Sequence, residues 1–120
     1  MQIRSFQDLV VWQKGMTLAK QIYQMTQTFP ISERFGLASQ MRRAAVAIPS
    51  NIAEGFSRKH RKEYRHFLLI AFGSGTELET QLLLTRDLNF LKKDEFITLS
   101  SILDEIQRML NKMITTLNKS

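Results

Sequence analysis

Apolar residues at helical spacing constrain the fold of this chain more than any other feature of its sequence. The last quarter of the chain places them three and four residues apart without a break, at Phe96, Leu99, Leu103, Ile106, Leu110, Met113 and Leu117. This spacing puts one apolar stripe along a helix, and the stripe must be buried against other helices. Three earlier segments show the same period, so the sequence predicts an all-α protein.

Four helices are predicted, over residues 6–29, 33–56, 61–88 and 94–118. The joins between them are short, which favours antiparallel neighbours. The expected fold is therefore an antiparallel up-down-up-down four-helix bundle, formed by a single domain over residues 1–120. A chain of 120 residues buries a core without disulfides, and this one has no cysteine.

Local signals mark the ends and the irregular points of these helices. A capping box beginning at Ser5 predicts the start of the first helix, and Ser32 is the expected N-cap of the second helix. Pro49 lies inside the second helix, where it should kink but not break it. Gly55 is the expected end of that helix, and Asn89 fits a left-handed C-cap for the third.

Positive charge is concentrated in one part of the chain. The net charge is +6, and residues 34–66 carry eight cations against two carboxylates, an excess equal to that of the whole chain. The cations are Arg34, Arg42, Arg43, Arg58, Lys59, Arg61, Lys62 and Arg65. Such an excess predicts a patch of positive potential, whose partner would be a polyanion, an anionic lipid or an acidic protein.

The densest part of this excess is residues 58–66. If the segment is helical, Arg58, Lys62 and Arg65 share one face, and Arg61 and Arg65 are one turn apart. Polyanion binding, a solvated turn between two helices and an acidic protein partner all fit this composition. Tyr64 is expected at the edge of the core, not as a platform for a base.

Residues for catalysis or metal binding are scarce. The histidines are His60 and His66, and the Glu63–His66 spacing resembles half of a di-metal bundle site whose second half is missing. The run Gly73-Ser74-Gly75-Thr76 lacks the spacing and lysine of a phosphate loop, and close helix packing explains it better. No catalytic residue, metal or cofactor is therefore expected.

No apolar run reaches the roughly 18 residues that a membrane helix needs, and no apolar signal segment opens the chain. With the absence of cysteine, these features predict a cytoplasmic protein with no membrane partner.

The segment from Met41 to Gly55 resembles a known family. Its run Pro49-Ser50-Asn51-Ile52-Ala53-Glu54-Gly55 is similar to the most specific motif of the 23S rRNA intervening-sequence proteins. Asp8 to Gln13 resembles the opening of that family, and Phe67 to Leu78 resembles its third helix. The family consists of small bacterial four-helix bundles without established enzymatic activity.

The resemblance also implies an assembly. Members are similar to the accessory protein of diversity-generating retroelements, which forms a pentamer and works with a reverse transcriptase and RNA. A homopentamer with a basic surface is thus implied here. For Pro49, Asn51 and Glu54, the expected role is structural or in assembly; the two polar side chains would satisfy the carbonyl freed by the proline or contact a neighbouring subunit.

These observations lead to one main functional hypothesis and one alternative. The main hypothesis is a non-enzymatic homo-oligomer that binds RNA or DNA through Arg42, Arg43, Arg58, Lys59, Arg61, Lys62 and Arg65. The alternative is a protein-interaction scaffold, or an accessory subunit of a nucleic-acid enzyme such as a reverse transcriptase.

Overall fold

Four long α-helices make up the computed structural model, which describes residues 2–118. They are α1 (Val10–Thr26), α2 (Leu37–Phe56), α3 (Arg61–Asp87) and α4 (Lys93–Asn118). Single 3-10 turns, η1 (Phe6–Asp8) and η2 (Ile31–Glu33), precede α1 and α2. Residues 2–118 contain no strand, so the predicted all-α class is confirmed.

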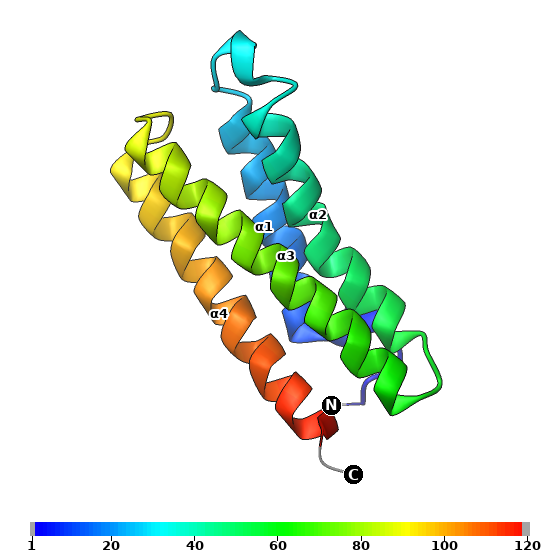
Figure 1. The fold of residues 1–120 in the computed structure, drawn as a ribbon. Helices are drawn as coiled ribbons and strands as arrows, with labels where there is room; N and C mark the ends of the chain where they lie inside the picture. The colour runs from blue at the N-terminus through cyan, green and yellow to red at the C-terminus, as the bar shows by residue number, and fades with distance from the viewer. Residues whose placement is uncertain (1, 119–120) are drawn as a thin grey trace.

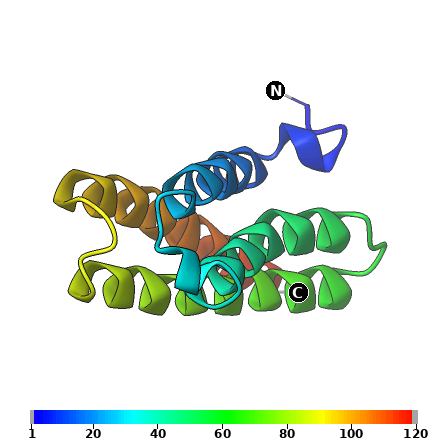
Figure 2. The same ribbon diagram turned by 90° about the horizontal axis from the view of Figure 1, so that it is seen from above.

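Consecutive helices run in opposite directions, as Figure 1 shows. Each helix packs against the next one along the chain, and α4 returns to pack against α1. The bundle measures 47 × 24 × 22 Å. The α2–α3 connection lies at the same end of the bundle as the C-terminus of α4, and the other two connections lie at the opposite end. Seen along another direction, η1 stands to one side of the four helices (Figure 2).

The core is formed by the apolar stripes that face the centre of the bundle. All four helices contribute side chains that are at most 2% exposed, among them Leu18, Ile22, Met41, Ile48, Ile52, Leu68, Leu78, Leu82, Ile106 and Leu110. The stripe predicted on the last helix is buried at its centre, whereas Phe96, Met113 and Leu117 are partly buried and pack against the core. Helical periodicity therefore identified the buried faces correctly.

The first helix is shorter than the sequence predicted. The predicted capping box is present: the Ser5 hydroxyl accepts from the Gln7 N–H, and the Asp8 carboxylate accepts from the Ser5 N–H. It caps the start of η1 and not the start of α1. Leu9 then adopts an extended conformation, and α1 begins at Val10. The prediction of a helix over 6–29 is thus wrong at both ends: the capping box satisfies a single turn before α1, and α1 ends at Thr26.

The second helix begins later than predicted. Ser32 lies within η2 and is not the N-cap of α2. Gly36 adopts φ −108° and ψ −111°, which is outside the helical region, so the chain cannot continue as one helix from residue 33. The Glu33 carboxylate instead accepts from the Leu37 N–H at 3.3 Å and satisfies one free donor at the start of α2.

The predictions made for Pro49, Asn89 and the glycines of the third helix are tested by the structure. α2 continues through Pro49 to Phe56, so the helix does not break there. Asn89 has φ 61°, and the Phe90 N–H donates to the Thr85 carbonyl at 3.0 Å, which completes the expected left-handed C-cap. A Cβ at Gly75 would overlap the Gln107 side chain of α4, whereas a Cβ at Gly73 would meet nothing within 4 Å. Close packing is therefore confirmed at Gly75, whereas Gly73 makes no such contact.

Candidate nucleic-acid interface

The connection between α2 and α3 is held by a close contact of the two helices. A Cβ at Gly55 would lie 2.9 Å from the Phe67 Cβ and 3.2 Å from the Tyr64 carbonyl oxygen, so only glycine allows this approach. Gly55 lies inside α2 and does not end it, and close packing is its role. Tyr64 is half-buried, its ring is edge-on to Phe56 at 6.1 Å, and burial raises the pKa of its hydroxyl. Tyr64 is thus part of the packed edge, as the sequence predicted.

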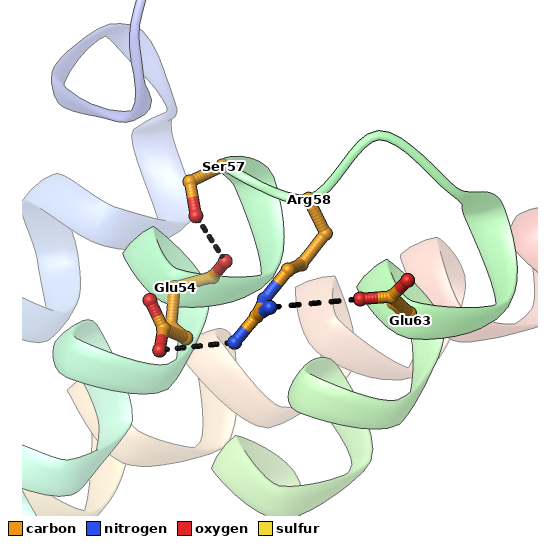
Figure 3. A network of polar contacts seen from close by, with 4 residues as sticks. All are labelled: Glu54, Ser57, Arg58 and Glu63. Atoms are coloured by element: carbon orange, nitrogen blue, oxygen red, sulfur yellow. Dashed lines mark hydrogen bonds and ion pairs between the residues drawn. The ribbon is translucent and has the colours of Figure 1, made fainter.

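The side chain of Arg58 is held by contacts within the chain. Figure 3 shows its guanidinium between two carboxylates, with Glu54 at 3.3 Å on α2 and Glu63 at 3.7 Å on α3. The same guanidinium lies 4.9 Å from the centre of the Phe67 ring. Because Arg58 precedes α3, it does not share a helical face with Lys62 and Arg65, and that expectation is wrong. Glu54 and Arg58 are four residues apart, and the structure shows that they form an ion pair.

Arg61 and Arg65 lie one turn apart on α3. Arg61 donates from Nη2 to the Thr116 carbonyl at 3.2 Å, in the last turn of α4. A cation at this position is favoured by the partial negative charge of a helix C-terminus. Arg65 is half-buried, and its Nε is buried without a hydrogen-bond partner among residues 2–118.

The lysines of this end remain accessible. Lys59 and Lys62 are exposed and form no ion pair within the part of the chain that the structure describes. Lys112 is also exposed and lies one turn before Thr116 on α4, at the same end of the bundle. Sequence reasoning missed Lys112, since it is 47 residues from Arg65 and only the antiparallel packing of α3 and α4 brings their ends together.

We call Arg58, Lys59, Arg61, Lys62, Arg65 and Lys112 the corner cluster. Its six cations face two carboxylates, Glu54 and Glu63, and both carboxylates contact Arg58. Lys59, Lys62 and Lys112 are exposed and form no ion pair within residues 2–118, which gives this end a positive potential.

Two of the predicted site residues lie elsewhere. Arg43 lies thirteen positions before Phe56, the last residue of α2, which is about 20 Å along the helix. Arg42 donates to the Thr26 hydroxyl at 2.8 Å and to the Tyr23 carbonyl at 3.2 Å, and its guanidinium lies 4.7 Å from the centre of the Tyr23 ring. The prediction of one continuous basic patch is therefore wrong: Arg42 and Arg43 belong to the opposite half of the bundle.

The motif residues Pro49, Asn51 and Glu54 all have partners within the chain. Pro49 is buried against α1, where a Cβ at Gly15 would meet its ring carbons at 3.4 Å. Asn51 donates from Nδ2 to the Ala47 carbonyl at 2.8 Å. It therefore does not satisfy the Ala45 carbonyl that the proline frees, contrary to one of the two expectations for this residue.

A groove between α1 and α2 adds an apolar surface. It has a volume of about 620 Å³ and is lined mainly by apolar side chains, among them Trp12, Met16, Tyr23, Val46 and Pro49. Trp12 is partly buried, packs against the core and meets Phe6 edge-on at 5.2 Å. Trp12 thus belongs to the core edge and also lines the groove.

Residues 2–118 show neither a group of metal ligands nor a membrane-spanning helix. No three His, Asp or Glu side chains within residues 2–118 lie close enough together to hold a metal ion. No helix in the same range is long and apolar enough to cross a membrane.

Comparison with known proteins identifies the family of this chain. Residues 7–112 match the family described as 23S rRNA-intervening sequence protein. The chain belongs to this family. A similar fold is seen in a crystal structure of a protein of unknown function from the S23 ribosomal protein family of Bacteroides thetaiotaomicron, with a TM-score of 0.82 and 22% sequence identity. The match covers 88% of this chain and 96% of that one. No curated protein matches the chain.

The family match supports the resemblance drawn from the Pro49–Gly55 run. The structural match supports the four-helix fold of this 23S rRNA-intervening sequence protein.

Proposed function

We propose that this 23S rRNA-intervening sequence protein is a non-enzymatic homo-oligomer of the cytoplasm that binds RNA or DNA through the corner cluster. The observation that carries the proposal is the charge at this end of the bundle, where Lys59, Lys62 and Lys112 are exposed and form no ion pair within residues 2–118, while Glu54 and Glu63 contact Arg58. A groove or end of one charge sign attracts the phosphate backbone without reading sequence.

The roles within the corner cluster are unequal. Arg58 and Arg61 hold the corner together through Glu54, Glu63 and the Thr116 carbonyl. Lys59, Lys62 and Lys112 are exposed, so they are the residues proposed to contact phosphates. Flexible lysines act as point charges on phosphate, which fits a contact that is not specific for sequence.

Assembly would strengthen weak contacts. The resemblance to pentameric proteins implies five copies, which would carry a net charge of +30. Several clusters on one particle bind a long nucleic acid with avidity. The apolar groove between α1 and α2 supports this part of the proposal, because copies of a chain commonly associate through apolar surface.

The same groove favours the second candidate, a scaffold or accessory subunit whose partner is a protein such as a reverse transcriptase. Apolar surface rimmed by polar residues marks protein contacts as well as contacts between copies. The two functions differ in how binding responds to salt.

The test is fluorescence anisotropy with a structured RNA, a single-stranded RNA and a duplex DNA, each titrated at several salt concentrations. If Lys59, Lys62 and Lys112 contact about three phosphates, the log–log salt slope is about −2.1 to −2.7. The variant Lys59→Gln/Lys62→Gln should weaken binding to every probe and reduce the slope by about 1.4 to 1.8.

A matched control is available at the other end of the bundle. Lys92 and Lys93 are exposed in the α3–α4 connection and at the start of α4, so Lys92→Gln/Lys93→Gln removes the same charge away from the corner cluster. Equal loss in the two double variants would overturn the corner cluster as the site. Absence of binding at low salt would overturn nucleic-acid binding and leave the scaffold function.

A further inference from the structure

A hollow at the α1–α2 end of the bundle combines cations with an exposed aromatic ring. It has a volume of about 710 Å³, within the range of about 300–1,000 Å³ found for small-ligand sites. The end of α1, the connection through η2 and the start of α2 form its walls. The side chains that matter here are Arg34, Phe35, Ser39, Arg42 and Arg43.

Phe35 is the most unusual of these side chains. It is 91% exposed, so the ring contributes almost nothing to the core. Exposed aromatic rings on a basic surface are platforms on which bases stack, because every base presents a π-face. Phe35 lies outside every apolar stripe, so no pattern in the sequence indicated a role for this ring.

Two of the three arginines are available to a ligand. Arg34 and Arg43 are exposed, and their side chains form no hydrogen bond or ion pair within residues 2–118. Arg42 is fixed by Thr26 and Tyr23, so it supplies a rigid positive charge beside them.

No carboxylate among the lining residues neutralises the positive charge of this hollow. Glu33 is its neighbouring carboxylate, and that carboxylate accepts from the Leu37 N–H at the start of α2. None of the residues that line the hollow is acidic. An apolar protein segment would have to desolvate Arg34 and Arg43 without a counter-charge, which is costly.

We infer that this hollow is a second nucleic-acid site, which binds an unpaired nucleotide by stacking its base on Phe35 and pairing its phosphate with Arg34 and Arg43. The inference rests on the proposed function and adds a ligand class to it, namely single-stranded nucleic acid. A duplex keeps its bases stacked inside the helix, so it offers phosphates to the corner cluster but no base to Phe35.

The test uses a fluorescein-labelled decamer of uridine and an RNA duplex of equal length. Phe35→Ala should weaken binding of the uridine decamer by about 5- to 150-fold, the effect of losing one stacked base, and leave the duplex unchanged. Ile31→Ala is the matched control, because Ile31 is 86% exposed and lines the same hollow but cannot stack a base. It should leave both probes unchanged.

Arginine variants separate this inference from the function on which it rests. Arg34→Gln/Arg43→Gln should reduce the salt slope for the uridine decamer by about 0.7, the value for one phosphate of a single strand, whereas Lys59→Gln/Lys62→Gln should weaken both probes. An unchanged affinity in Phe35→Ala, or equal losses in Phe35→Ala and Ile31→Ala, would overturn the second site while the corner cluster stands. If the wild-type protein binds neither probe, both proposals are overturned.

An acidic peptide is the competing occupant, and a poly-glutamate competitor tests it. Displacement of the uridine decamer by poly-glutamate to the same degree in wild type and in Phe35→Ala would show that charge alone is recognised, which overturns the nucleotide site. Displacement that is much easier in Phe35→Ala than in wild type supports stacking.

Discussion

Gly55 and Gly73 show how one residue type has opposite roles in adjoining helices. At Gly55 the missing side chain allows α2 to approach α3, because the Phe67 Cβ and the Tyr64 carbonyl occupy the space that a Cβ would need. At Gly73 the space is open, so the glycine only weakens the helix. Both glycines lie in segments that resemble family motifs, and the resemblance does not distinguish them.

Alanine at these two positions should therefore change stability in opposite directions. Gly55→Ala should lower the free energy of unfolding by about 1–2 kcal/mol, since overlap in a packed contact outweighs the gain in helix propensity. Gly73→Ala should raise it by about 0.5–1 kcal/mol. Urea unfolding followed by circular dichroism measures both, and a gain of stability in Gly55→Ala would contradict the close contact.

Tyr64 should make stability fall at alkaline pH. Burial raises the pKa of its hydroxyl, so the unfolded chain loses this proton at a lower pH than the folded chain does. Stability is complete below the unfolded pKa near 10 and falls as pH rises beyond it. Tyr64→Phe should reduce this fall, as measured by urea midpoints between about pH 8 and 11. Parallel pH profiles for the two proteins would show that burial of Tyr64 has no such effect.

At the scale of elements, Arg42 joins the end of α1 to the start of α2. From the sequence, Arg42 was predicted to belong to a basic patch, because only its charge and its position in the chain could be used. The structure shows its guanidinium held by Thr26 and Tyr23, across a connection of ten residues. Side chains on different helices meet only after packing, so periodicity could not reveal this role.

Arg42 and Arg43 should therefore differ in their effect on stability, although they are adjacent. Arg42→Met should lower the free energy of unfolding by about 1–2 kcal/mol, through the loss of two hydrogen bonds and the contact with the Tyr23 ring. Arg43→Met, at an exposed position, should change it by less than about 0.5 kcal/mol. Thermal unfolding compares the two variants, and equal losses would argue against the role of Arg42 as a link.

At the scale of the whole molecule, the positive charge is divided between the two ends of the bundle. The corner cluster lies around the α2–α3 connection, whereas Arg34 lies in the α1–α2 connection and Arg43 in the first two turns of α2. Figure 1 shows these two connections at opposite ends of the bundle. The apolar groove between α1 and α2 lies along the helices that join these ends. If copies associate through this groove, both basic regions remain available to a nucleic acid.

A charge in the groove should therefore reduce the size of the assembly. Val46 lines the groove and is 40% exposed, so Val46→Glu should lower the mass measured by light scattering without unfolding the chain. Ile97→Glu is the control, since Ile97 is 56% exposed on α4 and does not line the groove. An unchanged mass in Val46→Glu would place the contact between copies elsewhere or indicate a monomer.

The sequence by itself determined the fold class, the number of helices and the buried faces, because the 3.6-residue period of a helix is a local property of the chain. It also determined the left-handed cap at Asn89 and the packed edge at Tyr64, which depend on near neighbours. Its errors at Ser32 and in the first helix arose where short turns compete with helix over a few residues.

Tertiary structure alone decided which charges lie together. Residues 42–43 and 58–65 are close in sequence but separated by the rigid length of α2, whereas Lys112 is distant in sequence and reaches the corner by antiparallel packing. It also decided which cations are already paired and that Phe35 is left exposed. These properties depend on distances between elements, and the sequence of a single element contains no information about them.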